Sequence, residues 1–304
     1  METINLVYQA SDNATRLDKY LASELDEYTR SYIQMLIKDG LVYVNSKNEK
    51  ASYILKENDV IDVTIKELEP VDIIPQDIPL DIVYEDSDII VINKKEGMVV
   101  HPGAGNYKDT LVNALMYHCH DLSGINGEIR AGIVHRLDKD TTGLIVACKN
   151  DFAHRDLSIQ FANKLVTKKY IAICSGVIPH NLGKIDAPLA RDPKNRQQMT
   201  ILEGGKNAIT NFKVIERFKK HTLIEVLLET GRTHQIRAHM RYIGYPVIGD
   251  PIYGYKSEVD LEHGQYLHAK ELSFYHPRTK QLLSFSAPLP SYFEQKIIEL
   301  RNEE

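Results

Sequence analysis

The chain has 304 residues, of which 43% are hydrophobic and 26% are charged, which is typical of a globular protein with room for two domains. No apolar run approaches the roughly 20 residues of a membrane helix, and the polar start METINLVYQASDN excludes a secretory signal, so we expect a cytoplasmic protein without membrane association. Three widely spaced cysteines exclude a disulfide framework and a CxxC metal motif, and the net charge of −5 argues against indiscriminate nucleic-acid binding.

The first part of the chain, residues 1–66, is predicted to be a small α/β domain with its core at 15–65. Thr15 is a candidate N-cap for a first helix, and Gly40 is placed to end a second one. Apolar residues recur at helical spacing in both helices, and the alternating segments after them are typical of strands. The predicted elements are helices over 15–25 and 29–39 and strands over 41–44 and 59–65.

A linker is predicted over residues 67–80, which contain Pro70, Pro75 and Pro79. Proline lacks a backbone N–H and has a fixed φ, so these residues do not suit a helix or a central strand. We therefore expect an extended and fairly stiff connection between two domains.

The rest of the chain, residues 81–304, is predicted to form a larger catalytic domain. Its expected strands often follow one another without an intervening helix, which indicates an α+β fold with a mixed, largely antiparallel sheet and flanking helices. The predicted strands are 88–93, 169–174, 207–215 and 222–228, and the predicted helices lie near 109–119, 152–163, 235–243 and 291–301.

One acid stands out in this domain, Asp138 in the segment AGIVHRLDKDTTGLIVACKN (131–150). It lies between two apolar runs that are typical of strands, and its neighbours include His135, Arg136 and Lys139. Nearby cations keep a carboxylate ionised, and a short loop on a rigid scaffold suits a catalytic group. The alternative is an Asp that caps a turn and pairs with Arg136.

A second segment, EVLLETGRTHQIRAHMR (225–241), runs from an alternating strand through a turn into a helix. Arg232 lies at the turn, where backbone N–H groups also point outward, so it is placed to pair a carboxylate or to hold a phosphate. The helix after it carries His234, Arg237, His239 and Arg241 within two turns. The alternative is a helix whose basic face is merely solvated.

Charge is distributed unevenly along the chain. Residues 1–68 contain 8 Lys and Arg against 12 Asp and Glu, whereas residues 189–241 contain 11 against 5. A basic segment on a mildly acidic protein favours a localised track for RNA, although chance clustering on a solvated face would give the same counts.

Three other signals do not support a site. His118 and His120 have no third ligand at a suitable spacing, so we predict no metal site. The stretch that starts at His101 has two glycines but Lys108 where a dinucleotide fingerprint needs a third. HRLD is similar to the kinase motif HRD, but the chain has no glycine-rich phosphate loop and no D-F-G.

Taken together, these segments resemble the RluA/RluD-type family of bacterial pseudouridine synthases. The similar stretches are HRLDKDTTGLIV (135–146), KKYIAICSG (168–176), TGRTHQIRAH (230–239), LHA…LSFYHP (267–277) and, more weakly, VINKKEGMVVHPG (91–103). They span nearly the whole chain in family order, so together they are more specific than any one of them. The weaker block departs from the family's Asn-Lys-Pro-Ala-Gly at Lys95 and Glu96, which we expect to alter a loop rather than the chemistry.

The N-terminal run TRLDKYLA…TRSYIQMLIKDGLVYVNS resembles the small RNA-binding domain first described in ribosomal protein S-four. This resemblance implies that the helix pair presents Arg16, Arg30, Ser31 and Lys38 to RNA. The unit is acidic as a whole, so a modest affinity or a purely structural role is also compatible with it.

The family resemblance implies RNA isomerisation without a cofactor, in which the bond between uracil and ribose is broken and remade at carbon 5. We predict that Asp138 is the catalytic carboxylate. It could attack the sugar, attack the base or remove a ribose proton, and the sequence does not choose among these. We chose Arg232 as the cation that pairs with it, and the resemblance makes Tyr170 the ring that stacks on the extruded uracil. The residues expected to contact RNA are Arg136, which would fill the gap in the stack, and His135, Lys168, Lys169, Arg237 and Arg241.

The leading hypothesis is a monomeric pseudouridine synthase that acts on large-subunit ribosomal RNA, because the N-terminal unit resembles that of the ribosomal RNA branch. A tRNA substrate is the second hypothesis. A non-catalytic RNA-binding or ribosome-assembly factor is a third, and the presence of Asp138, Tyr170 and Arg232 argues against it. An unrelated hydrolase that uses Asp138 would need a metal or an oxyanion site, and the sequence offers no convincing metal cluster.

Overall fold

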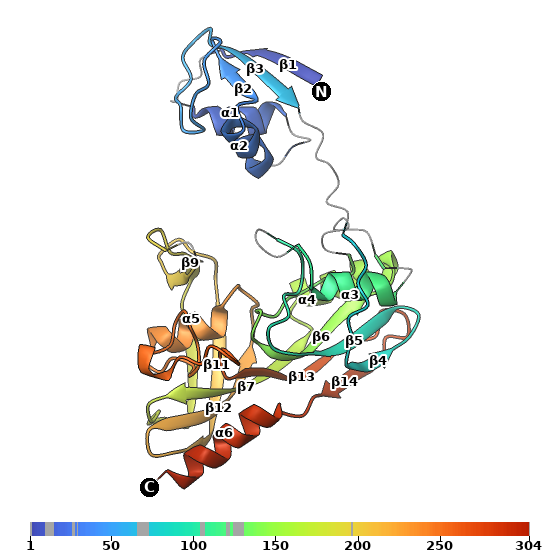
Figure 1. Ribbon diagram of the computed structural model, residues 1–304, viewed down its shortest axis with the longest axis vertical. Coiled ribbons are helices and arrows are strands. Elements are labelled where there is room, and N and C mark those ends of the chain that lie inside the picture. The colour runs from blue at the N-terminus through green and yellow to red at the C-terminus, as the bar shows by residue number, and fades with distance from the viewer. Residues whose placement is uncertain are drawn as a thin grey trace. The chain divides into compact units, whose positions relative to one another are not determined.

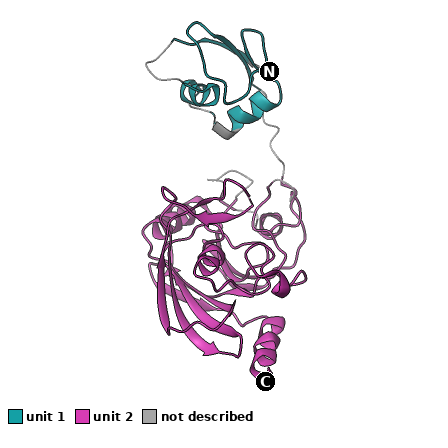
Figure 2. Ribbon diagram, turned by 90° about the vertical axis from the view of Figure 1, so that its left-hand side faces the viewer, with its two compact units in different colours: residues 1–71 teal, residues 72–304 magenta. Residues whose placement is uncertain are grey.

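The computed structural model describes residues 2–9, 15–25, 28, 30–65, 73–103, 107–119, 122–123, 131–195 and 197–303. The chain divides into two compact units, Met1–Val71 and Asp72–Glu304 (Figure 2).

The first unit contains a three-stranded antiparallel sheet with the order β1-β3-β2, together with two helices. Its elements are β1 (Glu2–Val7), α1 (Leu17–Glu24), α2 (Arg30–Lys38), β2 (Val42–Val44) and β3 (Val60–Ile65). Both predicted helices and both predicted strands are confirmed. The sequence pattern does not predict β1, whose segment ETINLV belongs to the polar start of the chain. The helix N-cap is Arg16 rather than Thr15, and the predicted start of the second helix at Thr29 lies outside the described residues.

The described part of the predicted linker, residues 73–80, packs on the second unit. Ile73 is buried in the core of that unit, with 3% of its surface exposed. Asn113 donates from Nδ2 to the carbonyl oxygen of Ile74 at 3.0 Å, and the backbone N–H of Gln76 donates to the carbonyl oxygen of Asn113 at 3.0 Å. Prolines keep this segment extended, but its apolar side chains hold it against the domain.

The second unit is built, within the described residues, on a nine-stranded sheet with the order β4-β5-β6-β13-β7-β12-β11-β8 and with β14 beside β13. The strand pairs of this sheet within the described residues are antiparallel except for β6 and β13, which run parallel, so the prediction of a mixed, largely antiparallel sheet is confirmed. The strands are β4 (Ile82–Glu85), β5 (Ile89–Lys94), β6 (Thr142–Cys148), β7 (Thr167–Ser175), β8 (Leu182–Asp186), β11 (Ile209–Arg217), β12 (His221–Leu228), β13 (Leu267–Tyr275) and β14 (Leu282–Ser286).

Helices cover both faces of this sheet because alternate strand residues point to opposite sides. On β7, Ala172 joins a core that also contains side chains of α3 and α5, whereas Ile173 packs with Phe293 of α6. Figure 1 shows α6 across the sheet from α5. The helices are α3 (Leu111–His118), α4 (Asp151–Ala162), α5 (Gln235–Tyr242) and α6 (Ser291–Asn302), and a separate pair of short strands is β9 (Leu189–Arg191) and β10 (Met199–Ile201).

The predicted helices of this unit are confirmed, and so are its four predicted strands, as β5, β7, β11 and β12. The apolar run before Asp138 is not a strand, however, and makes only a single bridge from Ile133 to Ala147 of β6. Ile133 is buried nevertheless, so its apolar character reflects packing rather than strand pairing. Among the described residues, no helix has both the length and the apolar character needed to cross a membrane.

Candidate active site

A buried lysine fixes the loop that carries Asp138. Lys94, at the end of β5, is 1% exposed, and its Nζ donates to the carbonyl oxygens of Lys95, Met98 and Lys139 at 2.8, 3.0 and 2.8 Å. Because Lys139 directly follows Asp138, this ammonium ties the loop to the sheet. Burial lowers the pKa of Lys94 to about 7, and nearby carboxylates oppose that shift.

The loop is fixed again where it enters β6. The backbone N–H of Thr141 donates to the carbonyl oxygen of Asp138 at 3.2 Å, and Gln265 Nε2 donates to the hydroxyl of Thr141 at 2.9 Å. Gly143 follows with φ +104°, and a Cβ on it would lie 2.3 Å from the carbonyl oxygen of Ala269. Only glycine permits both this backbone conformation and the close approach of β6 to β13. The turn from Asp138 to Thr141 and the entry of the chain into β6 therefore determine where the carboxylate sits.

Asp138 is paired with an arginine of α5. Arg237 Nη1 lies 2.9 Å from Asp138 Oδ2, and only 3% of Arg237 is exposed. The remaining nitrogens of the guanidinium face a second carboxylate, Asp250, with Nε to Oδ2 at 2.6 Å and Nη2 to Oδ1 at 2.8 Å. One buried guanidinium thus bridges two carboxylates, and Asp250 is itself completely buried.

The surroundings keep Asp138 ionised. Burial raises the pKa of the Asp138 carboxyl, but the charges of Arg237, His234 and Arg136 outweigh it and hold the pKa below its ordinary value. The side chain keeps 14% of its surface exposed, so the anion can still meet a substrate. An ionised carboxylate fixed by an ion pair and open on one side is suited to attack or to remove a proton.

His234 is held in a strained backbone conformation beside this pair. It has φ 53° and ψ 22°, a left-handed conformation that is uncommon for a residue with a side chain. In this conformation the ring lies in the site, with Nε2 3.9 Å from Asp138 Oδ1 and Nδ1 3.0 Å from the Tyr253 hydroxyl. Burial lowers the pKa of His234, while Asp138 acts in the opposite direction. In the sequence, His234 stands out only as one basic residue of the predicted helix, whereas in the structure it is the N-cap of α5.

A cavity of about 500 Å³ opens next to Asp138, within the usual range of small-molecule sites. Tyr170 of β7 forms part of its wall and is 7% exposed, and burial raises the pKa of its phenol, so it is a neutral aromatic surface. The cavity is lined by His101, Ile133, Val134, His135, Arg136, Asp138, Ser158, Phe161, Ala162, Lys168, Tyr170, Leu228, Gly231, Arg232 and Thr233.

Two predicted roles of arginines need correction. We expected Arg232 to pair with Asp138, but the cation in that ion pair is Arg237, and Arg232 Nε instead donates to the carbonyl oxygen of Asn207 at 2.9 Å. We expected Arg237 to contact RNA phosphate, but it is buried between two carboxylates. The turn before α5 points Arg232 outward, to the rim of the cavity, while the helix itself carries Arg237 inward.

The other predicted contacts around the cavity differ in their environment. Lys168 lines the cavity, and burial lowers its pKa to about 8. His135 also lines it, stacks on Phe161 and accepts a hydrogen bond at Nε2 from the backbone of β6. Lys169 is engaged in an ion pair with Glu271 at 3.0 Å.

The arginines Arg136 and Arg241 are exposed. Arg136 belongs to the lining of the cavity, and Arg241 lies over the ring of Tyr255 at 5.0 Å. Their contacts with RNA stay predictions.

In the first unit, Arg16 is bound to the buried Asp18, with Nε to Oδ1 at 3.0 Å. Lys38 is exposed in the last turn of α2. The side chains of Arg30 and Ser31 lie outside what the structure describes.

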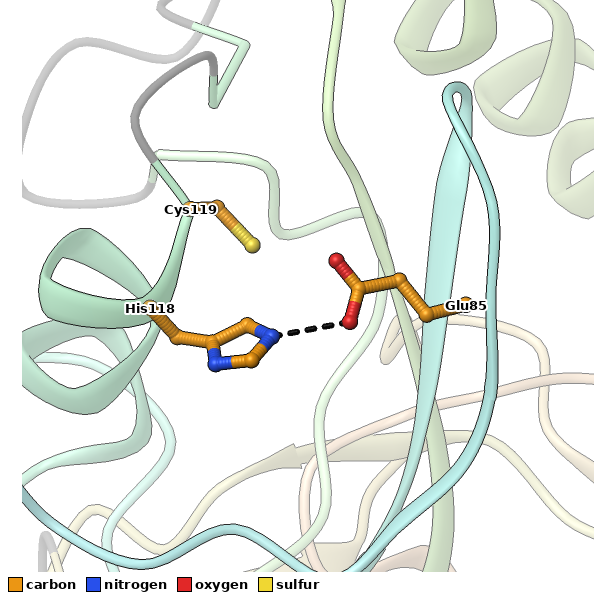
Figure 3. Close-up of side chains that lie close together, drawn as sticks. All are labelled: Glu85, His118 and Cys119. Carbon is orange, nitrogen blue, oxygen red and sulfur yellow. Dashed lines mark hydrogen bonds and ion pairs between the residues drawn. The ribbon is translucent and has the colours of Figure 1, made fainter.

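The described residues bring two groups of possible metal ligands together. Figure 3 shows the His118 ring facing the Glu85 carboxylate, with the Cys119 sulfur nearby, and their ligand atoms all lie within 4.8 Å of one another. Such donors suit zinc. The two Glu85 oxygens already meet His118 Nε2 and Lys149 Nζ, each at 2.8 Å, so ion pairing explains this cluster. His120, the other candidate ligand, lies outside the described residues.

The second group consists of Asp86, Asp88 and His276. His276 Nε2 lies 2.8 Å from Asp86 Oδ2, and Asp88 is paired with Arg278. These ion pairs account for the cluster in the same way.

The site combines a carboxylate that a buried arginine keeps ionised with an aromatic wall and a basic rim, and it is built on a mixed sheet. These features define an enzyme that can act on a flat base in a nucleic acid. Comparison with known proteins agrees with this. The model of the RNA pseudouridylate synthase family matches residues 88–242, and the S4 domain model matches residues 15–61. The chain belongs to the RNA pseudouridine synthase family, of the RluA type, and carries an N-terminal S4 RNA-binding domain. It is therefore an isomerase.

Similar proteins cover almost the whole chain. An uncharacterized RNA pseudouridine synthase of Bacillus subtilis, YlyB, is 50% identical over 301 residues, which is 99% of both chains. A ribosomal large subunit pseudouridine synthase D of Zymomonas mobilis is 44% identical over 304 residues, covering 94% of this chain and 95% of that protein. The solved structure of human RNA pseudouridylate synthase domain containing 4 is 25% identical, with a TM-score of 0.57, and covers 73% of this chain and 94% of that one.

Proposed function

We propose that this enzyme isomerises specific uridines in large-subunit ribosomal RNA and that Asp138 is its catalytic carboxylate. The observation that carries the proposal is the ion pair of Asp138 with Arg237 at 2.9 Å, at the wall of a cavity that also contains Tyr170. This arrangement supplies a fixed anion and an aromatic surface where a flat base can lie.

The chemistry assigns a task to each part of the site. The target nucleotide leaves the RNA stack, and its uracil enters the cavity against Tyr170. The bond from ribose to uracil nitrogen 1 breaks, the base rotates, and a bond from the same ribose carbon to uracil carbon 5 forms. The proton of carbon 5 is lost and nitrogen 1 gains one, so atoms and charge balance without a cofactor. Asp138, ionised by its neighbours, starts the exchange by attack or by removal of a ribose proton.

The basic residues at the rim support an RNA substrate. Arg136, Lys168 and Arg232 all line the cavity, so phosphates next to the extruded nucleotide would find cations there. Arg136 would occupy the gap that the base leaves in the stack. On the first unit, Lys38 of α2 is exposed and offers a further cation.

Two findings favour ribosomal RNA over tRNA. Several relatives at 41–44% identity are named ribosomal large subunit pseudouridine synthase D. The S4 domain is the second finding, because it resembles the domain of a ribosomal protein and would add an RNA contact in the first unit.

The test measures release of tritium from carbon 5 of uridine in large-subunit ribosomal RNA that lacks pseudouridine, and in tRNA as a parallel substrate. We expect the parent protein to release tritium from ribosomal RNA and Asp138→Asn to release none while it still binds that RNA. Release from tRNA alone would overturn the substrate, and full activity of Asp138→Asn would overturn the role of the carboxylate. Binding without any release from either RNA would support the RNA-binding factor instead.

A further inference from the structure

Asp250 is a completely buried carboxylate with four hydrogen bonds. It accepts from Nε and Nη2 of Arg237, at 2.6 and 2.8 Å. Its Oδ1 also accepts from the backbone N–H groups of Ile252 and Tyr253, at 2.9 and 3.0 Å. A carboxylate with this many charged and backbone donors has a single orientation.

The contacts of Arg237 leave only one edge of the guanidinium for Asp138. The two nitrogens that face Asp250 form a bidentate pair, which fixes both the plane and the rotation of the guanidinium. Nη1 is then directed to Asp138 Oδ2 at 2.9 Å. The face of the same group lies over the ring of Tyr253 at 5.1 Å, so the guanidinium is also held from that side.

We propose that Asp250 is a positioning residue for the isomerisation, because it orients Arg237 so that Arg237 in turn fixes the carboxylate of Asp138. The inference rests on the catalytic role proposed for Asp138. Asp250 does not line the cavity, so it acts through Arg237 and not by touching the RNA.

The charge balance gives this arrangement a second consequence. Two carboxylates share one guanidinium, so the three groups carry a formal charge of about −1. With Asp250 as a neutral side chain, Arg237 would offer its whole charge to Asp138 and would also lose the partner that fixes its rotation. The first change makes the Asp138 carboxylate less basic, and the second loosens its orientation. Small misplacements of reacting groups cost large factors in rate.

A structural contribution of Asp250 is expected as well, because it closes the turn at 250–253. The experiment therefore needs a readout that loss of folding does not move. Asp88 provides a matched control: it is 1% exposed, is paired with Nε and Nη2 of Arg278 at 2.8 and 2.6 Å, and does not line the cavity.

The test compares single-turnover tritium release by Asp250→Asn, Arg237→Lys and the double variant, each corrected for its folded fraction. Lysine keeps the charge but has one nitrogen, so it cannot meet both carboxylates as the guanidinium does. We expect each single variant to lose at least about tenfold in rate, with a KM for RNA within about twofold of the parent. If Asp250 acts through Arg237, the double variant is no slower than the slower single variant. Asp88→Asn should react within about twofold of the parent.

Multiplied losses in the double variant would overturn the inference, and so would a loss of less than about tenfold in Asp250→Asn. If Asp250→Asn does not fold, Arg237→Lys still decides, since a rate close to that of the parent means that the bridging geometry is unimportant. Failure of the proposed function is distinguishable, because the parent would then release no tritium from ribosomal RNA, or Asp138→Asn would retain activity, whatever the Asp250 variants do.

Discussion

Two arginines one helical turn apart on α5 have opposite environments. Arg237 lies over Tyr253, is 3% exposed and contacts two carboxylates, whereas Arg241 lies over Tyr255 and is exposed. The buried part of this helix places charge against Asp138, and its exposed part leaves charge open to the solvent. Identical side chains at a spacing that places them on one helix face can therefore serve different purposes.

Among the substitutions that test the difference between the two arginines, replacement of Arg237 should have the largest effect. Arg237→Met leaves Asp138 and Asp250 buried without their cation, so we expect a loss of about 3–5 kcal/mol in the free energy of unfolding. We also expect at least about a hundredfold loss in single-turnover rate, because Asp138 loses its orientation. Urea unfolding and tritium release measure the two effects.

Arg241→Met is the matched control for this change. It should alter the free energy of unfolding by no more than about 0.5 kcal/mol, as is usual for an exposed residue. Similar losses in both variants would mean that burial does not separate the two arginines.

Tyr170 tests whether the wall of the cavity acts by stacking. Tyr170→Ala should lower the single-turnover rate about 10- to 100-fold, since base stacking on an aromatic ring contributes about 1–3 kcal/mol. Tyr170→Phe keeps the ring and should stay within about threefold of the parent. If the Phe variant were as slow as the Ala variant, the hydroxyl rather than the ring would be the important group.

His268, a buried histidine that stays neutral, should make the stability of the protein depend on pH. It is completely buried, and burial lowers its pKa to about 4, while Thr142 Oγ1 lies 2.8 Å from its Nδ1. Its folded pKa lies below its unfolded value of about 6.5, so protonation favours unfolding and stability falls as the pH drops from about 6.5 towards 4. At pH 5 this amounts to about 2 kcal/mol relative to pH 8.

Urea unfolding of the parent and of His268→Gln at pH 8 and pH 5 measures this contribution as a difference. The variant should lose less stability between the two pH values than the parent does. Equal losses would mean that the pKa of His268 is the same in the folded and the unfolded protein.

The smallest expected effects are at the exposed rim. Arg241→Ala should weaken RNA binding about two- to fivefold at low salt and reduce the slope of log affinity against log salt by about one. Lys169→Ala should change that slope less, because Lys169 is already paired with Glu271 at 3.0 Å. Binding measured between about 50 and 200 mM salt, over which phosphate contacts weaken, compares the two variants. A larger change of slope in Lys169→Ala than in Arg241→Ala would mean that Lys169 contacts RNA phosphate.

Much of the fold was predictable because its signals are local. Helical spacing of apolar residues located α1 and α2, the other predicted helix ranges match α3 to α6, and strand-like runs located β5, β7, β11 and β12. The short strands β9 and β10 and the edge strands β4 and β14 were missed, because few residues in them are buried on a regular pattern. Asp250 was missed for a similar reason: an Asp between Gly249 and Pro251 is typical of an ordinary turn.

The sequence by itself determined the family, and it predicted two domains and Asp138 as the acid at the centre, because the motif around Asp138 is contiguous and its cationic neighbours are adjacent in the chain. Only the tertiary structure decided which arginine pairs with that acid. Arg237 and Asp138 are 99 positions apart, and Arg232 offers the same charge only five residues away from Arg237. Charge and spacing do not distinguish the two, because the choice depends on which guanidinium the packing of α5 carries into the interior and which carboxylates it meets there.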